Sequence, residues 1–328
     1  MNKGGMTMKR FLCLMITAAL LFSFAPLSLA EKQPNPIPVI PEAELSPTPK
    51  GIHHYLLICI DSWNTDLKKA GNHSDGMVLV TVDEYAQRVM LTSFIRDMLI
   101  QRPDGQFGRL NNVLDNFGRN KGGIDALVKT INTHFDLKIE DYIVVDFKQV
   151  QNIVDAIGGV DIEITAREAQ YLKNYPIGAS ATTPALSGAG TYHFSGYGAV
   201  IYMRMRKVAN IEGETQDVGR TRRARIVLTS IADSLKDITF DQAEALLDAV
   251  IENTLATSMS TTDMLDALDL AMELKGTEIE QIRMPIDGSF EPMPVAGMAT
   301  QQIDFIANRE ALHEFILDSF VVVEDDWE

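Results

Sequence analysis

The stretches IHHYLLICI (52–60), MVLVTV (77–82) and VMLTSFI (89–95) decide the fold. Each is a short, mostly apolar run rich in Val, Ile and Leu, which is typical of strands buried inside a sheet. YIVVD (142–146), VDIEI (160–164) and residues 279–284 are predicted to be strands as well. Helices are expected over residues 123–135, 147–157, 195–203, 219–235, 241–253, 262–274 and 302–317. Strands that alternate with helices predict an α/β fold, namely one αβα-layered domain with a mixed central sheet flanked by helices, and ligands at the strand ends.

The N-terminus predicts export. Lys9 and Arg10 precede an apolar run, and Ser28-Leu29-Ala30 has the small-x-small pattern of a signal-peptidase site. Residues 11–30 are also long enough to span a bilayer, so residues 1–30 are either a signal peptide or a retained signal anchor. We therefore expect the protein at the extracytoplasmic face of the cell membrane or in the cell wall. Residues 31–50 are rich in proline and read as an extended linker before a domain over 51–320, and residues 321–328 form an acidic tail.

A concentration of arginines stands out from an acidic chain. The 328 residues carry a formal net charge of −16, yet six arginines fall within residues 204–225. A chain this acidic repels nucleic acid, so the cluster indicates a site for one compact anion, with phosphate the best candidate. The alternative is a solvated basic helix whose arginines pair locally with Glu212, Glu214 and Asp217.

Helical phase divides this cluster. At about 100° per residue, Arg220 and Arg223 share one helix face, while Arg222 and Arg225 share the opposite face. One pair is therefore expected to face a site and the other to face water. Residues 204 and 206 are both arginine, and they point the same way only if that segment is extended.

Charged residues also follow the predicted strands. Asp61 follows the first strand, Asp75 immediately precedes the second, and Arg96 and Asp97 close the third. If these strand ends converge, the carboxylates can surround a divalent ion and the guanidinium can bind phosphate oxygens. Taken singly, each aspartate is equally compatible with a turn or a helix cap.

The order of these motifs resembles that of the LytR-CpsA-Psr family of bacterial cell-envelope phosphotransferases, over residues 52–318. The matching segments are Asp61 with HSDGM (73–77), SFIRD (93–97), RLNN (109–112) with GG (122–123), YIVVDF (142–147) with GGVD (158–161), residues 196–206, and DVGRTRR (217–223). Any one of these is unspecific, but their common order indicates common descent.

The resemblance implies a reaction and a set of roles. Members of the family transfer a glycopolymer, such as a teichoic acid or a capsule polysaccharide, from a polyprenyl-pyrophosphate carrier to peptidoglycan at the membrane surface. The lipid tail occupies an apolar tunnel. By analogy, Asp75, Arg96, Asp217 and Arg220 are catalytic, Asp75 and Asp217 bind Mg²⁺, and Asp75 is a candidate base. The residues implied in substrate binding are Arg204, Arg206, Arg223, Asp61, Asp97 and Arg109.

Five positions depart from the family pattern. Trp63, His73, Gly76, Ile95 and Ala224 stand where the family usually has Arg, Arg, Thr, Pro and Gln. Trp63, His73 and Ala224 favour one alternative, a noncatalytic polyprenyl-phosphate-binding or regulatory protein, and a polyprenyl-pyrophosphate hydrolase is a second alternative. Serine hydrolase, nucleotide hydrolase and thiol redox functions lack their motifs.

Overall fold

A computed structural model of the chain describes residues 34–63, 66–67, 73–118, 123–177 and 186–317. The compact unit begins at Pro36, and residues 34 and 35 before it are irregular. The predicted signal segment (1–30) and acidic tail (321–328) lie outside the described residues. None of the described helices combines the length and the apolar composition that crossing a bilayer requires.

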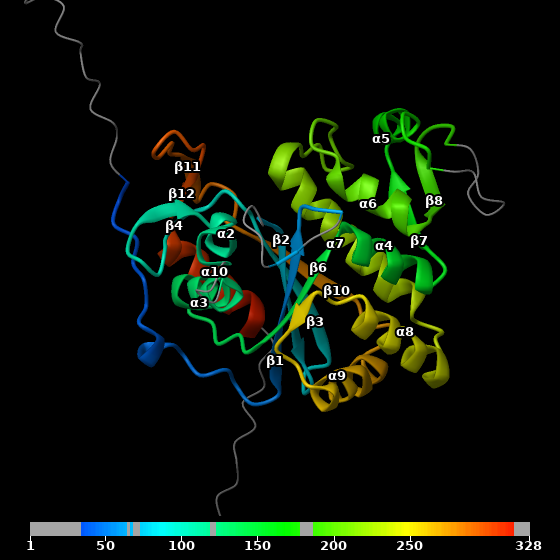
Figure 1. Ribbon diagram of the computed structural model, residues 1–328, viewed down its shortest axis with the longest axis horizontal. Helices are drawn as coiled ribbons and strands as arrows, with labels where there is room; N and C mark the ends of the chain where they lie inside the picture. Colours follow the sequence, from blue (N-terminus) through cyan, green and yellow to red (C-terminus); the bar gives the residue numbers. More distant parts are fainter. Residues whose placement is uncertain (1–33, 64–65, 68–72, 119–122, 178–185, 318–328) are drawn as a thin grey trace, which may run out of the picture. The chain divides into compact units, whose positions relative to one another are not determined.

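A six-stranded mixed sheet forms the centre of the unit (Figure 1). Its strands lie in the order β10 (Ile279–Met284), β3 (Arg88–Phe94), β2 (Ser74–Asp83), β1 (Ile52–Ile60), β6 (Asp141–Asp146) and β9 (Ala256–Thr257). β1, β2 and β3 are an antiparallel meander, whereas β6 is parallel to β1 and β10 is parallel to β3. The four strands β1, β3, β6 and β10 therefore end at one edge of the sheet, and β2 begins there.

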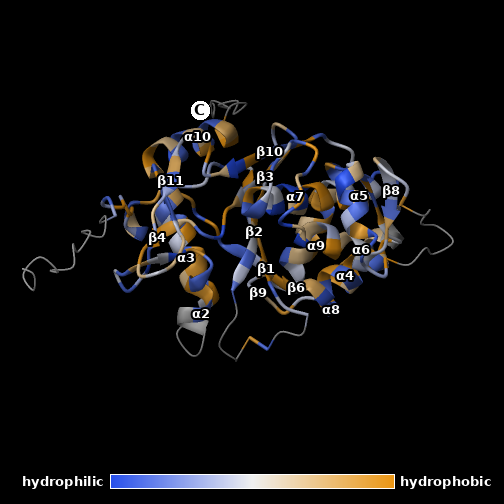
Figure 2. Cartoon of the chain, turned by 90° about the horizontal axis from the view of Figure 1, so that it is seen from above, coloured by the Kyte–Doolittle hydropathy of each residue, from blue (hydrophilic) through white to orange (hydrophobic). Residues whose placement is uncertain are grey.

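Helices cover both faces of this sheet, which Figure 2 shows from above. One layer holds α2 (Asn112–Gly118), α3 (Gly123–Phe135) and α10 (Phe305–Leu317). The other layer holds α4 (Phe147–Ala156), α6 (Gly196–Arg204), α7 (Gln216–Ser234), α8 (Phe240–Glu252) and α9 (Thr261–Glu273). The predicted α/β fold, an αβα-layered domain with a mixed sheet, is confirmed.

Three two-stranded sheets complete the unit, and the sequence pattern missed most of their strands. They are β4 (Leu99–Gln101) with β5 (Phe107–Arg109), β7 (Val160–Ile164) with β8 (Gly190–Phe194), and β11 (Phe290–Pro292) with β12 (Gln301–Ile303). The two remaining elements are the 3-10 helix η1 (Glu42–Glu44) and α5 (Ala166–Leu172). Residues 160–164 form the predicted strand, but β7 pairs with β8 in a separate sheet and does not join the central one. The helix predicted from residue 302 begins at Phe305, because β12 occupies residues 301–303.

Two apolar cores hold these layers together. The first lies between the sheet and the layer of α2, α3 and α10, and includes Leu56, Ile58 and Phe135. The second lies around β7, β8, α5 and α6, and includes Ile162 and Phe194. The sheet is thus packed tightly on one face, and the second core supports α7 from the side away from the sheet.

The proline-rich segment before β1 lies on the body rather than forming a free spacer. Ile40 N donates to the carbonyl of Thr133 in α3 at 2.9 Å, and Arg309 in α10 donates to the carbonyl of Pro38. Ser46 Oγ donates to Asp136 Oδ2 at 2.7 Å. Residues 36–50 therefore belong to the folded unit, which differs from the linker predicted over 31–50.

Candidate active site

The strand ends bring most of the predicted site residues together. Asp61 follows β1, Arg96 follows β3, and Asp75 lies at the start of β2 on the same edge. The prediction that Asp75 precedes its strand is wrong, because β2 begins at Ser74, which pairs with Ile60. Asp217 and Arg220 come from the N-terminal half of α7.

Three donors hold the Asp75 carboxylate. Arg96 Nη1 and Arg220 Nη1 donate to Oδ2 at 2.5 and 3.2 Å, and Asn111 Nδ2 donates to Oδ1 at 2.9 Å. The side chain is only 8% exposed. Burial alone raises the pKa of Asp75, but Arg220 and Arg96 bring the pKa below its usual value. Asp75 is therefore an ionised carboxylate at neutral pH.

Asp217 is joined to the same two arginines. Its Oδ1 lies 3.2 Å from Arg96 Nε and 3.3 Å from Arg220 Nη2. Arg206 Nη2 donates to Oδ2 at 3.3 Å. Two atoms of this network, Asp217 Oδ1 and Arg220 Nε, are buried without a well-aligned hydrogen bond. The network therefore retains capacity to bind a ligand.

A cavity of about 260 Å³ opens beside the network. Asp61, Asp75, Arg204, Arg206 and Arg220 form its polar wall. Because α6 ends at Arg204 and Met205 is extended, both neighbouring arginines reach the cavity, with 40% and 44% of their side chains exposed. The apolar wall is formed by Cys59, Met77, Val78, Phe147, Met203 and Ala224.

Asp61 and a second carboxylate, Asp75, line the same cavity. Arg204 Nη2 lies 3.6 Å from Asp61 Oδ1. Burial and the neighbouring Asp75 raise the pKa of Asp61, while Arg204 and Arg220 oppose that rise. The two aspartates thus differ in basicity, with Asp75 the more acidic.

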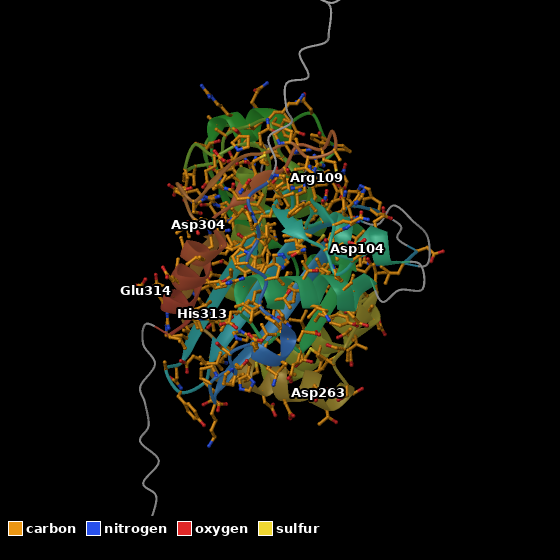
Figure 3. All side chains as sticks on the ribbon, turned by 90° about the vertical axis from the view of Figure 1, so that its left-hand side faces the viewer. Asp104, Arg109, Asp263, Asp304, His313 and Glu314 are labelled. Carbon is orange, nitrogen blue, oxygen red and sulfur yellow. The ribbon has the colours of Figure 1, made fainter. Side chains whose placement is uncertain are left out.

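Three predicted substrate-binding residues do not join the cluster. Arg223 is fully buried and donates to Glu168 Oε1 and to the carbonyls of Met205 and Val208. Arg109 Nε donates to the carbonyl of Ala299 at 2.8 Å, and Figure 3 shows this residue from the side of α2, α3 and α10.

Asp97 packs against the β12 segment rather than lining the cavity. Its carbonyl accepts from Gln301 N at 3.0 Å, and its Oδ1 is buried without a hydrogen bond to any other described residue. Burial and the nearby Asp217 raise the pKa of Asp97.

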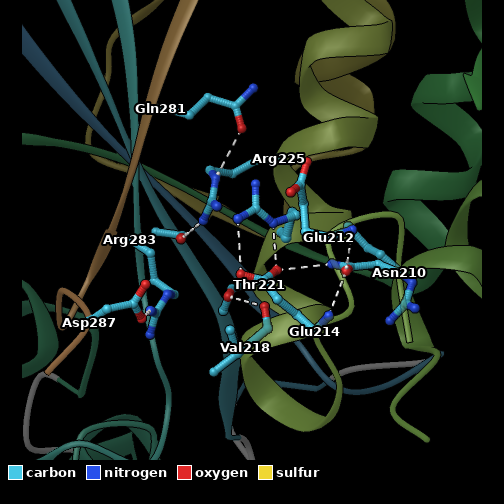
Figure 4. A network of polar contacts seen from close by, with 12 residues as sticks. Asn210, Glu212, Glu214, Val218, Thr221, Arg225, Gln281, Arg283 and Asp287 are labelled. Atoms are coloured by element: carbon cyan, nitrogen blue, oxygen red, sulfur yellow. Dashed lines mark hydrogen bonds and ion pairs between the residues drawn. The ribbon is translucent and has the colours of Figure 1, made fainter. Parts of the chain in front are cut away.

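The other α7 arginines are occupied elsewhere. Arg222 donates to both oxygens of Glu214, at 2.5 and 2.9 Å, as the salt-bridged helix alternative predicts for this residue. Arg225 contacts Ser93 in β3 and donates to Gln281 Oε1 in β10 at 3.1 Å (Figure 4). Arg225 is therefore a buried link between α7 and the sheet, not a residue facing water.

Sequence reasoning missed Asn111 as a site residue. Besides bonding Asp75, its backbone N–H donates to the carbonyl of Arg96 at 3.0 Å, and its carbonyl accepts from Ser74 N. It thereby fixes the relative position of β2 and Arg96. The signal was present in the RLNN motif (109–112), which begins at the last residue of β5.

A second cavity of about 280 Å³ lies on the same face of the sheet. Tyr55, Val80 and Ile143 form its sheet side, and Leu270 and Leu274 from the region of α9 form its outer side. Along β1, Tyr55 lines this cavity and Cys59 lines the first one, with half-buried Leu57 between them on the same face. The charged cavity and the apolar cavity are thus aligned along one strand.

The acidic pair fits a magnesium ion. Within the described ranges, no group of three or more His, Cys, Asp and Glu side chains forms a metal cluster. Mg²⁺ commonly takes only one or two carboxylates and completes its shell with phosphates and water. Asp75 and Asp217, joined through shared arginines, supply such a pair, and the Oδ1 of Asp217, which makes ion pairs but no well-aligned hydrogen bond among the described residues, is a candidate ligand atom.

The sequence and the structure of this chain are similar to those of known proteins. A family model, the LytR_cpsA_psr family, matches residues 31–312. The polyisoprenyl-teichoic acid–peptidoglycan teichoic acid transferase TagU of Oceanobacillus iheyensis is 28% identical over 241 residues, which are 72% of this chain and 67% of TagU. Biofilm regulatory protein A of Streptococcus mutans is 25% identical over 207 residues, 60% of this chain and 48% of that protein, so the chain spans about half of its length. The crystal structure of Bacillus subtilis TagV matches with a TM-score of 0.61 at 21% identity, over 83% of this chain and 98% of TagV.

Proposed function

Because the chain belongs to the LytR-CpsA-Psr family, we propose that it transfers a glycopolymer from a polyprenyl-pyrophosphate carrier to peptidoglycan at the cell envelope. One observation carries the proposal. Arg96 and Arg220 each form ion pairs with both Asp75 and Asp217, beside a cavity that is lined by two further, half-exposed arginines. The names of TagU and TagV, which are teichoic acid transferases, supply the reaction class.

The reaction exchanges one phosphorus–oxygen bond for another. An acceptor hydroxyl oxygen attacks the phosphorus that carries the glycopolymer, and the bond from that phosphorus to the bridging oxygen breaks. The polyprenyl monophosphate leaves with the electron pair, and the hydroxyl proton passes to Asp75. Catalysis of this kind depends on positioning and on neutralising charge, which fixed guanidiniums provide.

The geometry supports Asp75 as the base. In the free protein, Arg96 and Arg220 keep its pKa low, which makes the carboxylate a weak base. A pyrophosphate that draws these guanidiniums toward its own oxygens removes part of that stabilisation. The basicity of Asp75 then rises only when substrate is bound.

Charge balance supports a cation. Four arginines of the site, Arg96, Arg204, Arg206 and Arg220, face three aspartates, which leaves one excess positive charge against a doubly charged pyrophosphate diester. Held by Asp75 and Asp217, Mg²⁺ would supply the missing charge neutralisation.

The apolar cavity supports a lipid-linked substrate. Cys59 in the charged cavity and Tyr55 in the apolar cavity are four residues apart on β1, or about 13 Å. A polyprenyl chain that leaves the pyrophosphate along this face passes Leu57 and enters the apolar cavity. The half-buried state of Leu57 in a central strand fits such an occupant.

A transfer assay tests the proposal. The full chain receives a polyprenyl-pyrophosphate-linked glycan with a labelled sugar, together with peptidoglycan and Mg²⁺. We expect label in the peptidoglycan and release of polyprenyl monophosphate, loss of both with chelator, and recovery with added Mg²⁺. Asp75→Asn should reduce transfer at least about 100-fold, whereas Asp104→Asn, in the exposed loop between β4 and β5, should not.

Two outcomes would overturn it. Release of monophosphate at the same rate without peptidoglycan identifies a hydrolase, and binding without release identifies a noncatalytic binding protein. Transfer that persists in excess chelator removes Mg²⁺ from the reaction.

A further inference from the structure

Three aromatic side chains form a cluster beside the charged cavity. Trp63 follows β1, Phe147 begins α4, and Tyr197 lies in the first turn of α6. The Trp63 ring centroid lies 5.5 Å from that of Phe147 and 6.0 Å from that of Tyr197. We call this group the aromatic platform. Phe147 lines the cavity, and Trp63 remains 36% exposed.

Two local features build the platform. The carbonyl of Ser62 accepts from Phe147 N at 2.9 Å, which ties the segment after β1 to the start of α4. Gly196 lets α6 approach α4 closely, because a Cβ at this position would lie 2.0 Å from the Gln151 carbonyl oxygen. The close approach of α6 brings Tyr197 beside Trp63.

Arg204 connects the platform to the anion site. Its guanidinium carbon lies 4.5 Å from the Phe147 ring centroid and 5.8 Å from that of Trp63, and Arg204 also lines the charged cavity. A phosphate bound by Arg204 therefore lies close enough to Trp63 for a ring bonded to that phosphate to contact the Trp63 side chain. Whatever is bonded to that phosphate on its outer side meets the platform.

We propose that the aromatic platform binds the sugar ring that is bonded to the pyrophosphate of the carrier-linked substrate. A pyranose has an apolar face of C–H bonds that stacks on an exposed aromatic ring, and its hydroxyls need polar partners at the rim. Trp63 supplies the ring, and the partly exposed Asp61 carboxylate supplies an acceptor. This inference rests on the proposed function and extends it to the sugar.

A different role for Trp63 predicts a different result. If Trp63 serves only to fix Arg204 through the cation–π contact, its removal weakens every diphosphate ligand alike. If it stacks on the sugar, its removal weakens only ligands that carry a sugar. Two probes of equal charge separate these roles: a short polyprenyl diphosphate esterified to one N-acetylhexosamine, and the same diphosphate esterified to methyl.

The experiment measures dissociation constants of both probes for the full chain by calorimetry. We expect Trp63→Ala to weaken the sugar-bearing probe about 10-fold and the methyl ester less than about 2-fold, which corresponds to the stacking of one ring. Trp63→Phe should keep most of the affinity, and Tyr197→Leu should show the same selective loss if Trp63→Ala does not fold. Tyr85→Ala removes an exposed aromatic ring in the turn between β2 and β3 and should change neither.

Equal loss of both probes in Trp63→Ala, or no loss of either, would overturn the platform while leaving the proposed transfer intact. Failure of the unaltered protein to bind either probe would overturn the proposed function, and the platform with it.

Discussion

Arg220 and Arg223 lie less than one turn apart on α7, yet they belong to two different kinds of region. Every nitrogen of Arg223 donates within a fully buried pocket, to Glu168 and to two backbone carbonyls at 2.7 to 2.9 Å. Arg220 contacts Asp75 and Asp217 beside a cavity, and its Nε has no hydrogen-bond partner among the residues that the structure describes. We call a side chain saturated when all its hydrogen-bonding atoms already have partners within the protein. Saturation, rather than charge, therefore separates a structural arginine from one able to bind a ligand.

Their divergence follows from the place of α7. Residues three apart differ by about 60° around a helix, and an arginine side chain is long enough to amplify that angle. One side of the helix faces the sheet, and the other faces the core around β7, β8, α5 and α6. Two arginines of one stripe therefore end in different surroundings.

The strongest test of the comparison is Arg223→Ala. The substitution leaves the Glu168 carboxylate buried without its partner and two carbonyls without donors. We expect a loss of about 3 to 5 kcal/mol in the free energy of unfolding, measured with denaturant. Affinity of the folded fraction for a diphosphate ligand should change little, because Arg223 does not reach the cavity.

A paired variant serves as its control. Arg223→Met together with Glu168→Gln removes both charges and keeps a side chain able to cap α5, so it should recover part of the lost stability. If the free energy of unfolding of Arg223→Ala lies within about 1 kcal/mol of that of the unaltered protein, the Arg223–Glu168 pair is not a structural link.

Arg220→Ala tests the unsaturated region. It removes a guanidinium from the pyrophosphate site, so we expect transfer to slow about 30- to 1,000-fold, equal to about 2 to 4 kcal/mol of transition-state stabilisation. Its free energy of unfolding should change less than that of Arg223→Ala. The matched control is Arg222→Ala, which breaks a partly exposed ion pair with Glu214. This variant should lower the free energy of unfolding by about 0 to 1 kcal/mol. Equal effects of the two variants on rate would contradict the assignment of Arg220.

The sequence predicted the sheet and the strand-end charges because both depend on local pattern. Long apolar runs such as residues 52–60 form central strands wherever they are covered on both faces. Residues 160–164 misled the prediction, although their strict alternation of apolar and charged residues was itself a sign of a half-exposed strand. The fate of Arg223 could not be predicted, because its partner Glu168 is 55 residues away in the chain.

The aromatic platform shows the same limit. Trp63, Phe147 and Tyr197 come from three segments that the sequence gives no reason to associate. Their meeting depends on the parallel pairing of β1 with β6 and on the close crossing of α6 over α4. Contacts between elements set the neighbours of a side chain, whereas local pattern sets only the element in which it stands.

His134 extends the comparison to a saturated group that pH can disrupt. This histidine of α3 lies with Nδ1 2.7 Å from the Thr130 carbonyl oxygen, and its Nε2 accepts from Gln101 N at 3.1 Å. That pattern fits a neutral ring with its proton on Nδ1. Burial, helped by the nearby Arg309, lowers the pKa of His134 to about 4. A second proton would point Nε2–H at the Gln101 N–H.

The expected result is a loss of stability in mild acid. Because the folded pKa lies below the unfolded value of about 6.5, the contribution of neutral His134 is complete above pH 6.5 and is lost as the pH falls toward 4. The difference in pKa corresponds to about 3 kcal/mol over that window.

Unfolding by urea at a series of pH values should therefore show a steeper fall in the free energy of unfolding for the unaltered protein than for His134→Gln. His54, whose pKa is also lowered to about 4 by burial, contributes equally to both proteins and cancels in the comparison. Identical slopes for the two proteins would show that His134 titrates alike in the folded and unfolded states and is not the saturated group that its contacts indicate.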